Sequence, residues 1–193
     1  MSWSYLPAQA QSDDSLYVES GIIKTKSGND KEAINDFNKA IEINPKNPEA
    51  YYNLANVQFK LGDTKSAMTC YNKVIELDVR HDRAYKDRGK LKAAFNDFAG
   101  SIEDFTKAIF VNPNYSDAYF NRGLSNFNLK LYENAIVDFS KAIELNPADA
   151  GAYFSRGNAK SHTLGKMAAC LDWSKAGELG YFKAYEAIRQ NCN

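Results

Sequence analysis

The chain has 193 residues, of which 44% are hydrophobic and 25% are charged, and these proportions exclude an intrinsically disordered protein. Its 24 basic and 24 acidic residues give a formal net charge of zero, so the composition offers no electrostatic case for binding nucleic acid or an anionic membrane surface. No apolar run approaches the roughly 20 residues that a membrane-spanning helix requires, so we expect no membrane insertion.

Residues 1–13, MSWSYLPAQAQSD, form a predicted N-terminal segment that fits no pattern found in the rest of the chain. Within it, Ala8-Gln9-Ala10 has the small-x-small form of a signal-peptidase site, although a basic leader and a full apolar stretch are both missing. The segment is either a disordered terminus or the remnant of a trimmed export signal. The localisation therefore stays open between the cytoplasm and, if the export signal is real, the periplasm or the cell exterior.

From residue 14 onward, one phrase returns at a fixed interval. The strings NDFNKAIEINP, TCYNKVIELDV, EDFTKAIFVNP and VDFSKAIELNP end at residues 45, 79, 113 and 147, each 34 residues after the one before. Frames of this period cover residues 14–47, 48–81, 82–115, 116–149 and 150–183. The chain is thus predicted to be an array of five repeats.

Each frame contains two helical patterns. With slots numbered from the start of a frame, slots 4 and 24 always hold an aromatic residue, and slots 8, 20 and 27 hold small or narrow ones. Slots 4, 8 and 11 share one face of a 3.6-residue period, and slots 20, 24, 27 and 28 share another. Glycine or asparagine marks a turn between them, and proline near the end of most frames stops one helix and starts the next. Each repeat is predicted to be a pair of helices, A and B, that must stack on its neighbours to bury its apolar face.

This set of residues resembles the tetratricopeptide repeat, whose signature places an aromatic, a small residue, an alanine, an aromatic, an alanine and a proline in that order. The resemblance covers about 170 of the 193 residues and implies an all-α fold, a right-handed superhelical solenoid of helix–turn–helix repeats. After it, Tyr181 to Gln190 reads as a helix, and residues 181–192 would cap the apolar end of the array. The ending ACLDWSKAGELG is similar to that of many bacterial tetratricopeptide proteins.

The recurring phrase contains aspartates that lie three residues before a lysine: Asp36, Asp104, Asp138 and Asp172. This is a neighbour spacing on a helix surface, and it predicts exposed ion pairs that contribute roughly 0.2–0.5 kcal/mol each. The aspartates lie one repeat apart on a face expected to be solvated, which argues against a catalytic role.

The sequence offers no catalytic or metal-binding arrangement. His81 and His162 lie in distant frames, and there is no glycine-rich phosphate loop and no Cys-x-x-Cys. Because the repeats occupy almost the whole chain, we expect no enzyme, no cofactor and no metal. Cys70 takes an aspartate's place and is expected to be an unreactive thiol at or near the surface, exposed or partly buried. Cys170 and Cys192 would come close if the last B helix and the capping helix form a hairpin, so they are a possible disulfide in an oxidising compartment and otherwise two nearby thiols.

In tetratricopeptide proteins the A helices line the concave surface, and slots 2, 5, 6 and 9 face a groove. In this chain those slots differ from copy to copy, whereas the packing slots do not. Asparagine amides suit a peptide backbone, aromatic rings offer apolar contact, and a basic cluster in the third repeat suits an acidic side chain or a C-terminal carboxylate. The expected groove residues are Tyr52, Asn53, Asn56, Arg83, Lys86, Lys90, Phe120, Asn121, Leu124, Phe154 and Asn158.

The leading hypothesis is therefore a protein–protein interaction module that binds a peptide segment of a partner in its concave groove, as a monomer or a weak homo-oligomer. The alternative is a structural scaffold that self-associates or bridges subunits through its ends or its convex face. A solvated face without a ligand is a third interpretation. The sequence names no partner.

Overall fold

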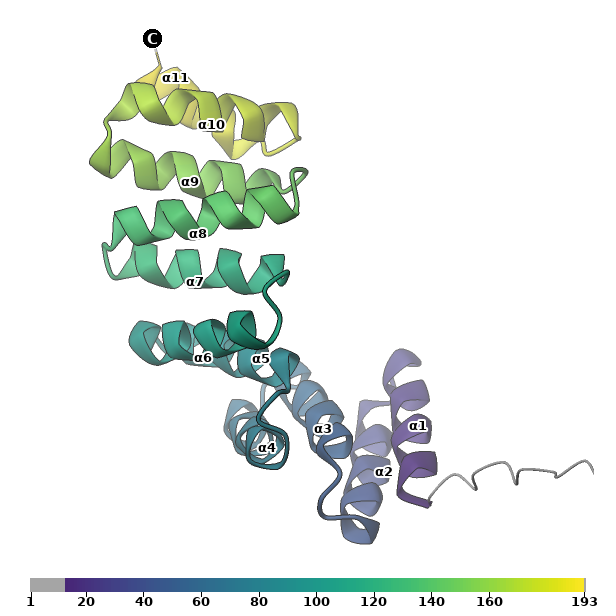
Figure 1. Ribbon diagram of the computed structural model, residues 1–193. Helices are drawn as coiled ribbons and strands as arrows, with labels where there is room; N and C mark the ends of the chain where they lie inside the picture. The colour runs from purple at the N-terminus through teal and green to yellow at the C-terminus, as the bar shows by residue number, and fades with distance from the viewer. Residues whose placement is uncertain (1–12, 193) are drawn as a thin grey trace, which may run out of the picture. The chain divides into compact units, whose positions relative to one another are not determined.

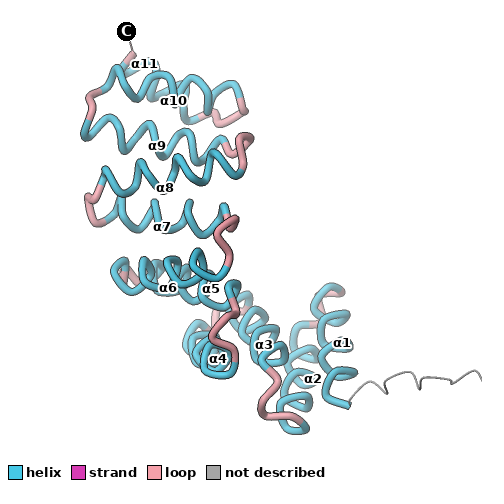
Figure 2. The backbone as a smooth tube through the Cα atoms, in the orientation of Figure 1, coloured by secondary structure: helices cyan, strands magenta, loops and turns pink. Residues whose placement is uncertain are grey.

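The computed structural model describes residues 13–192, and there it is built from helices joined by short loops, with no strand (Figure 2). The predicted N-terminal segment, including Ala8-Gln9-Ala10, lies outside the described residues except for Asp13. The helices are α1 (Asp13–Lys26), α2 (Asp30–Ile43), α3 (Pro48–Lys60), α4 (Thr64–Leu77), α5 (Asp82–Ala94), α6 (Phe98–Val111), α7 (Ser116–Asn128), α8 (Tyr132–Leu145), α9 (Ala150–Thr163), α10 (Lys166–Glu178) and α11 (Lys183–Asn191) (Figure 1).

The chain divides into two compact units, Met1–Arg80 and His81–Asn193. The helices pack as successive antiparallel pairs, α1 on α2 and α3 on α4 in the first unit, and α5 on α6, α7 on α8 and α9 on α10 in the second. Within each unit the B helix of one pair packs on the A helix of the next, and Figure 1 shows this stacking from α5 to α11. The predicted all-α solenoid of helix pairs is confirmed. None of the helices within residues 13–192 combines the length and the apolar character that crossing a membrane requires.

The residues that repeat with the 34-residue period fill the core. The slot 20 residues and the slot 24 phenylalanines are fully buried, among them Ala135 and Phe139. Gly123, at slot 8 of the same repeat, lies so close to this ring that an added Cβ would be 2.7 Å from Phe139 Cε1. The small residue on helix A and the large ring on helix B are therefore two halves of one contact.

The recurring aspartates do not lie on a solvated face, and this prediction was wrong. Asp36, Asp104, Asp138 and Asp172 are only 3% to 5% exposed. Each aspartate faces the A helix of its own repeat. Arg122 donates from Nη2 to Asp138 Oδ1 at 2.6 Å and from Nε to Oδ2 at 3.0 Å. The equivalent ion pairs are Arg88–Asp104, Arg156–Asp172 and Lys24–Asp36, at 2.7, 2.7 and 2.6 Å.

The lysines that follow these aspartates take different partners. Lys141 and Lys175 pair with Glu144 and Glu178 three residues further along, at 2.6 and 3.0 Å. The arginines extend the polar contact between repeats, because Arg156 Nη1 also donates to Ser140 Oγ of the preceding B helix at 3.1 Å. The phrase DFxKA is thus a scaffold motif with one buried and one exposed charge.

The second repeat replaces this ion pair as a whole. Cys70 stands at the aspartate position, and Leu54 and Gln58 stand where the other repeats place the basic partners. Cys70 is buried, and burial raises the pKa of its thiol to about 11, with a smaller contribution from the negative charge of Asp63. This environment agrees with the expected unreactive thiol.

The capping helix α11 begins at Lys183, two residues later than predicted, and ends at Asn191. Its Ala184 is fully buried against the cluster formed by Ala169, Trp173 and Ala176. Tyr185 donates from its hydroxyl to the Gly177 carbonyl at 3.1 Å. At the other end of α11, a disulfide joins Cys170 to Cys192, with their Cα atoms 5.8 Å apart.

Candidate functional site

The predicted groove residues are divided between the two units. Tyr52, Asn53 and Asn56 lie on α3 in the first unit, and the other eight lie on α5, α7 and α9 in the second. On α3, Asn56 Oδ1 accepts a hydrogen bond from the Tyr71 hydroxyl at 2.7 Å. Asn53 donates from Nδ2 to the carbonyl and the carboxylate of Glu49, at 2.8 and 2.9 Å. Both amides are thus partly engaged within the unit itself.

On α5, the predicted basic cluster is weaker than the sequence suggested. Lys86 Nζ lies 2.9 Å from Asp87 Oδ1 and 5.6 Å from the centre of the Tyr115 ring. Burial opposes the charge of Lys86, but the hydrogen bond and the charge of Asp87 outweigh it and hold the pKa of Lys86 above its ordinary value. Lys86 is a paired cation, whereas Arg83 and Lys90 are exposed.

On α7 and α9, the predicted apolar side chains are half-buried between repeats rather than spread on an open surface. The rings of Phe120 and Phe139 are tilted with centroids 5.7 Å apart, and those of Phe154 and Tyr181 are 4.7 Å apart. Leu124 packs against the cluster around Phe139. These residues pack within their own repeat and, through Ala159, on the next one, so they present only part of their surface outward.

The asparagines at slot 9 have a structural partner on helix B. Trp173 donates from Nε1 to Asn158 Oδ1 at 2.9 Å, just as Tyr71 donates to Asn56. Where slot 24 holds a phenylalanine, which has no donor, slot 9 holds a different residue: Ile22, Lys90 or Leu124. The residue at slot 9 therefore depends on the packing residue at slot 24. This dependence could have been found by comparing the five repeats in the sequence.

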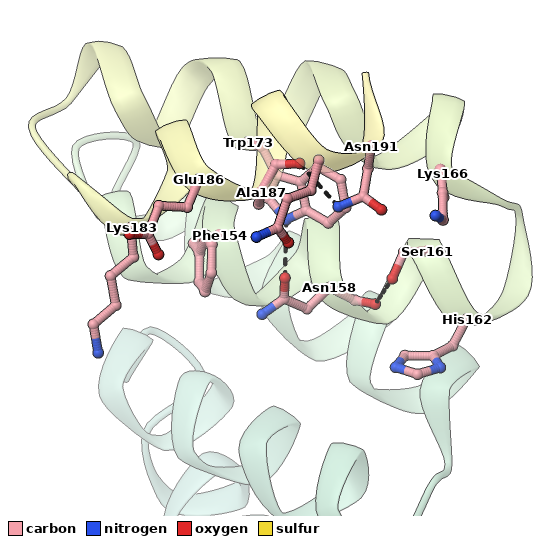
Figure 3. Close-up of a pocket in the computed structure, with 11 residues that line it drawn as sticks. Phe154, Asn158, Ser161, His162, Lys166, Trp173, Lys183, Glu186, Ala187 and Asn191 are labelled. Carbon is pink, nitrogen blue, oxygen red and sulfur yellow. Dashed lines mark hydrogen bonds between the residues drawn. The ribbon is translucent and has the colours of Figure 1, made fainter. Parts of the chain in front are cut away.

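A cavity of about 480 Å³ lies between α9, α10 and α11 at the C-terminal end of the second unit (Figure 3). Its lining residues are Phe154, Asn158, Ser161 and His162 from α9, Lys166 and Trp173 from α10, and Lys183, Glu186, Ala187, Gln190 and Asn191 from α11. We call it the α9–α11 pocket. Of the predicted groove residues, it brings together only Phe154 and Asn158.

The contribution of α11 was missed from the sequence, where this helix was given only a capping role. Its buried face packs on α10, and its polar face forms one wall of the pocket. The sequence signal was the spacing of Lys183, Glu186, Gln190 and Asn191, which places these polar residues on one side of a helix. The pocket thus combines the α9 face, which the repeat pattern predicts, with the polar face of α11, which it does not.

The pocket combines apolar surface with oriented amides. Since Trp173 occupies Asn158 Oδ1, the Nδ2 group of Asn158 is left as a donor. Asn191 has the opposite arrangement, because its Nδ2 donates to the Ala187 carbonyl at 2.9 Å and leaves Oδ1 as an acceptor. One donor and one acceptor beside apolar rings suit the backbone of a peptide. Across residues 13–192, no group of three His, Cys, Asp or Glu side chains is arranged to hold a metal ion.

A second hollow, of about 560 Å³, lies at the N-terminal end of the first unit. Its lining residues are Asp13, Leu16, Tyr17, Ser20 and Ile43, from α1 and α2. It contains two large apolar side chains that are half exposed, Leu16 and Ile43.

Comparison with known protein families gives three matching segments. The description "TPR repeat" matches residues 21–62, and "Tetratricopeptide repeat" matches residues 48–81 and 116–149. The last two segments coincide with two of the frames predicted from the period. No curated protein matches the chain.

Solved structures with the same fold cover most of the chain. A MamA protein is 26% identical, covers 89% of this chain and 94% of its own, and superposes with a TM-score of 0.80. MamA from Desulfovibrio magneticus RS-1 is 22% identical, with coverage of 88% and 97% and a TM-score of 0.80. YrrB, described as a TPR protein with an unusual peptide-binding site, is 19% identical, with coverage of 90% of both chains and a TM-score of 0.79.

The periodic residues, the stacked helix pairs and these matches all indicate the same type of repeat. Proteins of this repeat type are generally interaction modules for other proteins, without catalytic activity of their own. The chain is a tetratricopeptide repeat protein.

Proposed function

We propose that this protein binds an extended peptide segment of a partner protein along the face lined by α5, α7 and α9, with the α9–α11 pocket as the anchoring point. The observation that carries the proposal is the pocket itself, where Phe154 and Asn158 of the A-helix face meet a polar wall from α11. Its volume of about 480 Å³ falls within the range of sites that hold a few side chains of a ligand.

The peptide class of ligand is supported by the chemistry of the lining. Hydrogen-bond donors and acceptors from Asn158, Gln190 and Asn191 alternate with the apolar surfaces of Phe154, Trp173 and Ala187. A peptide offers both backbone groups and side chains to such a surface. Nothing in this lining resembles a nucleophile held by a base, so a binding role fits better than a catalytic one.

The test is selection of binding peptides from a random library on the immobilised wild-type protein, followed by a comparison with two Ala→Arg variants. Ala187→Arg places a long charged side chain in the pocket, and Ala99→Arg makes the same change on the exposed surface of α6. We expect the selected peptides to lose at least tenfold in affinity for Ala187→Arg and to bind Ala99→Arg as wild type. If the selected peptides bind wild type and both variants with equal affinity, the pocket is not the anchoring point.

The N-terminal end of the array supports a second candidate function, assembly through that end. Slots 3 and 10 of α3, α7 and α9 are buried, as for Ala50 at 0% and Val57 at 1% exposure, and the preceding B helix packs on each of these A helices. In α1 the same slots hold Leu16 and Ile23, which are 49% and 64% exposed. Apolar residues at positions that the repeat normally buries favour a contact with another molecule.

Assembly through this end is tested by the oligomeric state. If it operates, the wild-type protein forms concentration-dependent dimers in sedimentation equilibrium, and the double substitution Leu16→Glu, Ile23→Glu makes it monomeric. The double substitution Val137→Glu, Leu171→Glu is the control, because it changes two exposed apolar residues on B helices of the second unit. A wild-type protein that is monomeric at high concentration would rule this second function out.

A further inference from the structure

Two lysines stand at opposite ends of the α9–α11 pocket. Lys183 is the first residue of α11, and Lys166 is the first residue of α10. The two helices are antiparallel, because Cys170 near the start of α10 is joined to Cys192 just after α11, while Gly177 near the end of α10 contacts Tyr185. Lys166 therefore lies beside the C-terminal end of α11, and Figure 3 shows the two lysines on opposite sides of the cavity.

Neither lysine forms an ion pair within residues 13–192. Lys160 on α9 and Lys175 on α10, which do not line the pocket, pair with Asp172 and Glu178 at 2.9 and 3.0 Å. Within residues 13–192, no carboxylate lies within 4 Å of the ammonium group of Lys166 or Lys183. Two cations without an internal partner at the ends of one cavity are suited to two anionic groups of a ligand.

The length of α11 sets the approximate distance between the backbone positions of the two lysines, and so the approximate spacing of those anionic groups. The nine residues of α11 span about 13 Å at 1.5 Å per residue. An extended peptide rises about 3.3 Å per residue, so it covers this length in four steps. Alternate side chains of an extended peptide point to the same side, so residues i, i+2 and i+4 face the pocket together.

The middle of the pocket is apolar. Phe154, Trp173 and Ala187 lie between the two lysines, and they offer a surface to the residue at i+2. The hydrogen bonds of the two amides use Asn158 Oδ1 and Asn191 Nδ2, so Asn158 Nδ2 and Asn191 Oδ1 can bond backbone groups of a ligand. Apart from Glu186, which lies beside Lys183 on α11, the order of chemistry along the pocket is thus cationic, apolar, cationic.

We propose that the α9–α11 pocket recognises a protein segment of the form acidic–x–apolar–x–acidic in an extended conformation. The two acidic side chains pair with Lys183 and Lys166, and the apolar side chain packs on Phe154 and Trp173. This rests on the proposed peptide-binding function and specifies the class of sequence that the site selects. It also moves the acidic preference from the α5 cluster, where Lys86 is paired with Asp87, to the C-terminal pocket.

Glu186 is the only carboxylate among the lining residues, and it lies three residues after Lys183 on α11. Its charge opposes the acidic residue that pairs with Lys183. Replacing it by glutamine removes this repulsion and is expected to strengthen binding of an acidic ligand by about two- to threefold. The variant is a useful test, because few substitutions in a binding site are expected to improve affinity.

The probe is a fluorescein-labelled peptide, Gly-Glu-Ala-Leu-Ala-Glu-Gly, whose binding is followed by fluorescence polarisation at low salt. The first comparison peptide has glutamine in place of both glutamates, and the second has the two glutamates adjacent. The protein variants are Lys166→Glu, Lys183→Glu and Glu186→Gln, with Lys107→Glu on the exposed surface of α6 as a control of equal charge change.

We expect the probe to bind wild type about fivefold or more tightly than either comparison peptide. Lys166→Glu and Lys183→Glu each weaken probe binding by about fivefold or more, Lys107→Glu leaves it within twofold, and Glu186→Gln strengthens it. Equal binding of the three peptides, or equal losses with Lys107→Glu, overturns the proposal. If library-selected peptides occupy the pocket but ignore both lysines, this motif is wrong while the proposed function stands. If no peptide depends on Ala187, the proposed function itself fails.

Discussion

We expect the buried aspartates to have a larger effect on stability than their spacing to lysine suggested, because each forms a buried ion pair. Asp138 is held by Arg122 and by Asn126, whose Nδ2 donates to Asp138 Oδ2 at 2.9 Å. Asp138→Ala would leave the guanidinium of Arg122, a side chain that is 21% exposed, without its carboxylate. Because a largely buried charge without its partner is strongly unfavourable, we expect a loss of about 3 kcal/mol in the free energy of unfolding.

Urea unfolding followed by circular dichroism measures this loss. The control is Lys141→Ala, three residues further along, which removes only the exposed pair with Glu144 and should change stability by about 0.5 kcal/mol or less. Equal effects of the two substitutions would mean that Asp138 is no more important than a surface charge.

We expect Asp36 to make the stability of the first unit depend on pH in the acidic range. Burial disfavours the ionised carboxyl, but hydrogen bonds from Lys24 and Ser20 and the charges of Lys24 and Lys39 outweigh it, so the pKa of Asp36 lies below its ordinary value. A lowered pKa in the folded state gives stability that is present above the unfolded pKa of about 3.9 and is lost as the pH falls below it. The stability difference between wild type and Asp36→Asn should thus be constant from pH 7 to about 5 and shrink below pH 4. A difference that stays constant down to pH 3 would contradict the ion pair.

The Cys70 thiol should react only when the first unit unfolds. With its pKa raised to about 11, less than about one thiol in a hundred is ionised at pH 8, and the sulfur is also buried. Iodoacetamide at pH 8 should label Cys70 in urea and leave it unmodified in the native protein, as read by mass spectrometry. Rapid labelling of the native protein would show that the replacement of the ion pair by Leu54, Gln58 and Cys70 is less well packed than the structure indicates.

At the scale of the helices, α11 depends on the Cys170–Cys192 bond. The helix has nine residues, which is too short to be stable alone, and Ala184 is its only fully buried residue. The bond closes a sequence separation of 22 residues, for which chain-entropy arguments give a stabilisation of about 3 kcal/mol. Reduction should therefore increase amide hydrogen exchange in α11 by about a hundredfold and leave α7 and α8 unchanged.

The control for this experiment is Cys192→Ser. Under oxidising conditions, the amides of α11 in this variant should exchange as fast as those in the reduced wild-type protein. Since α11 supplies one wall of the pocket, both proteins should also bind pocket ligands more weakly. If α11 exchanges slowly in the reduced protein, packing of Ala184 and Ile188 alone is enough to hold the helix, and the bond is incidental.

The succession of helix pairs was predictable, while the facing of individual residues was not. The 34-residue period placed the helix pairs, because aromatic and small residues at slots 8 and 24 must meet wherever a pair forms. The period could not show that Asp138 faces Arg122, which lies sixteen residues earlier on the other helix of the pair. A pattern within one helix shows which of its residues share a face, but not which residues of another helix they contact. The α9–α11 pocket was missed for a related reason, since α11 lies outside the period and its polar wall has no counterpart in the repeats.

At the scale of the whole molecule, the pocket is contained in one of the two compact units. Every residue that lines it, together with the bond that holds α11, lies within His81–Asn193. In repeat proteins stability is approximately a sum of repeat and neighbour-interface terms, so a set of complete repeats with a capped end can fold without the rest. We therefore expect a fragment of residues 81–193 to be helical and to bind the acidic probe peptide within about twofold of the full chain.

Two measurements make this comparison decisive. Circular dichroism establishes that the fragment is folded, and fluorescence polarisation compares its affinity with that of the full chain, using Lys183→Glu in both backgrounds. Equal loss from Lys183→Glu in fragment and full chain shows that the same contact operates in each. A helical fragment that no longer binds would instead mean that residues of the first unit contact the ligand directly, and the predicted groove positions Tyr52, Asn53 and Asn56 would be the first to substitute.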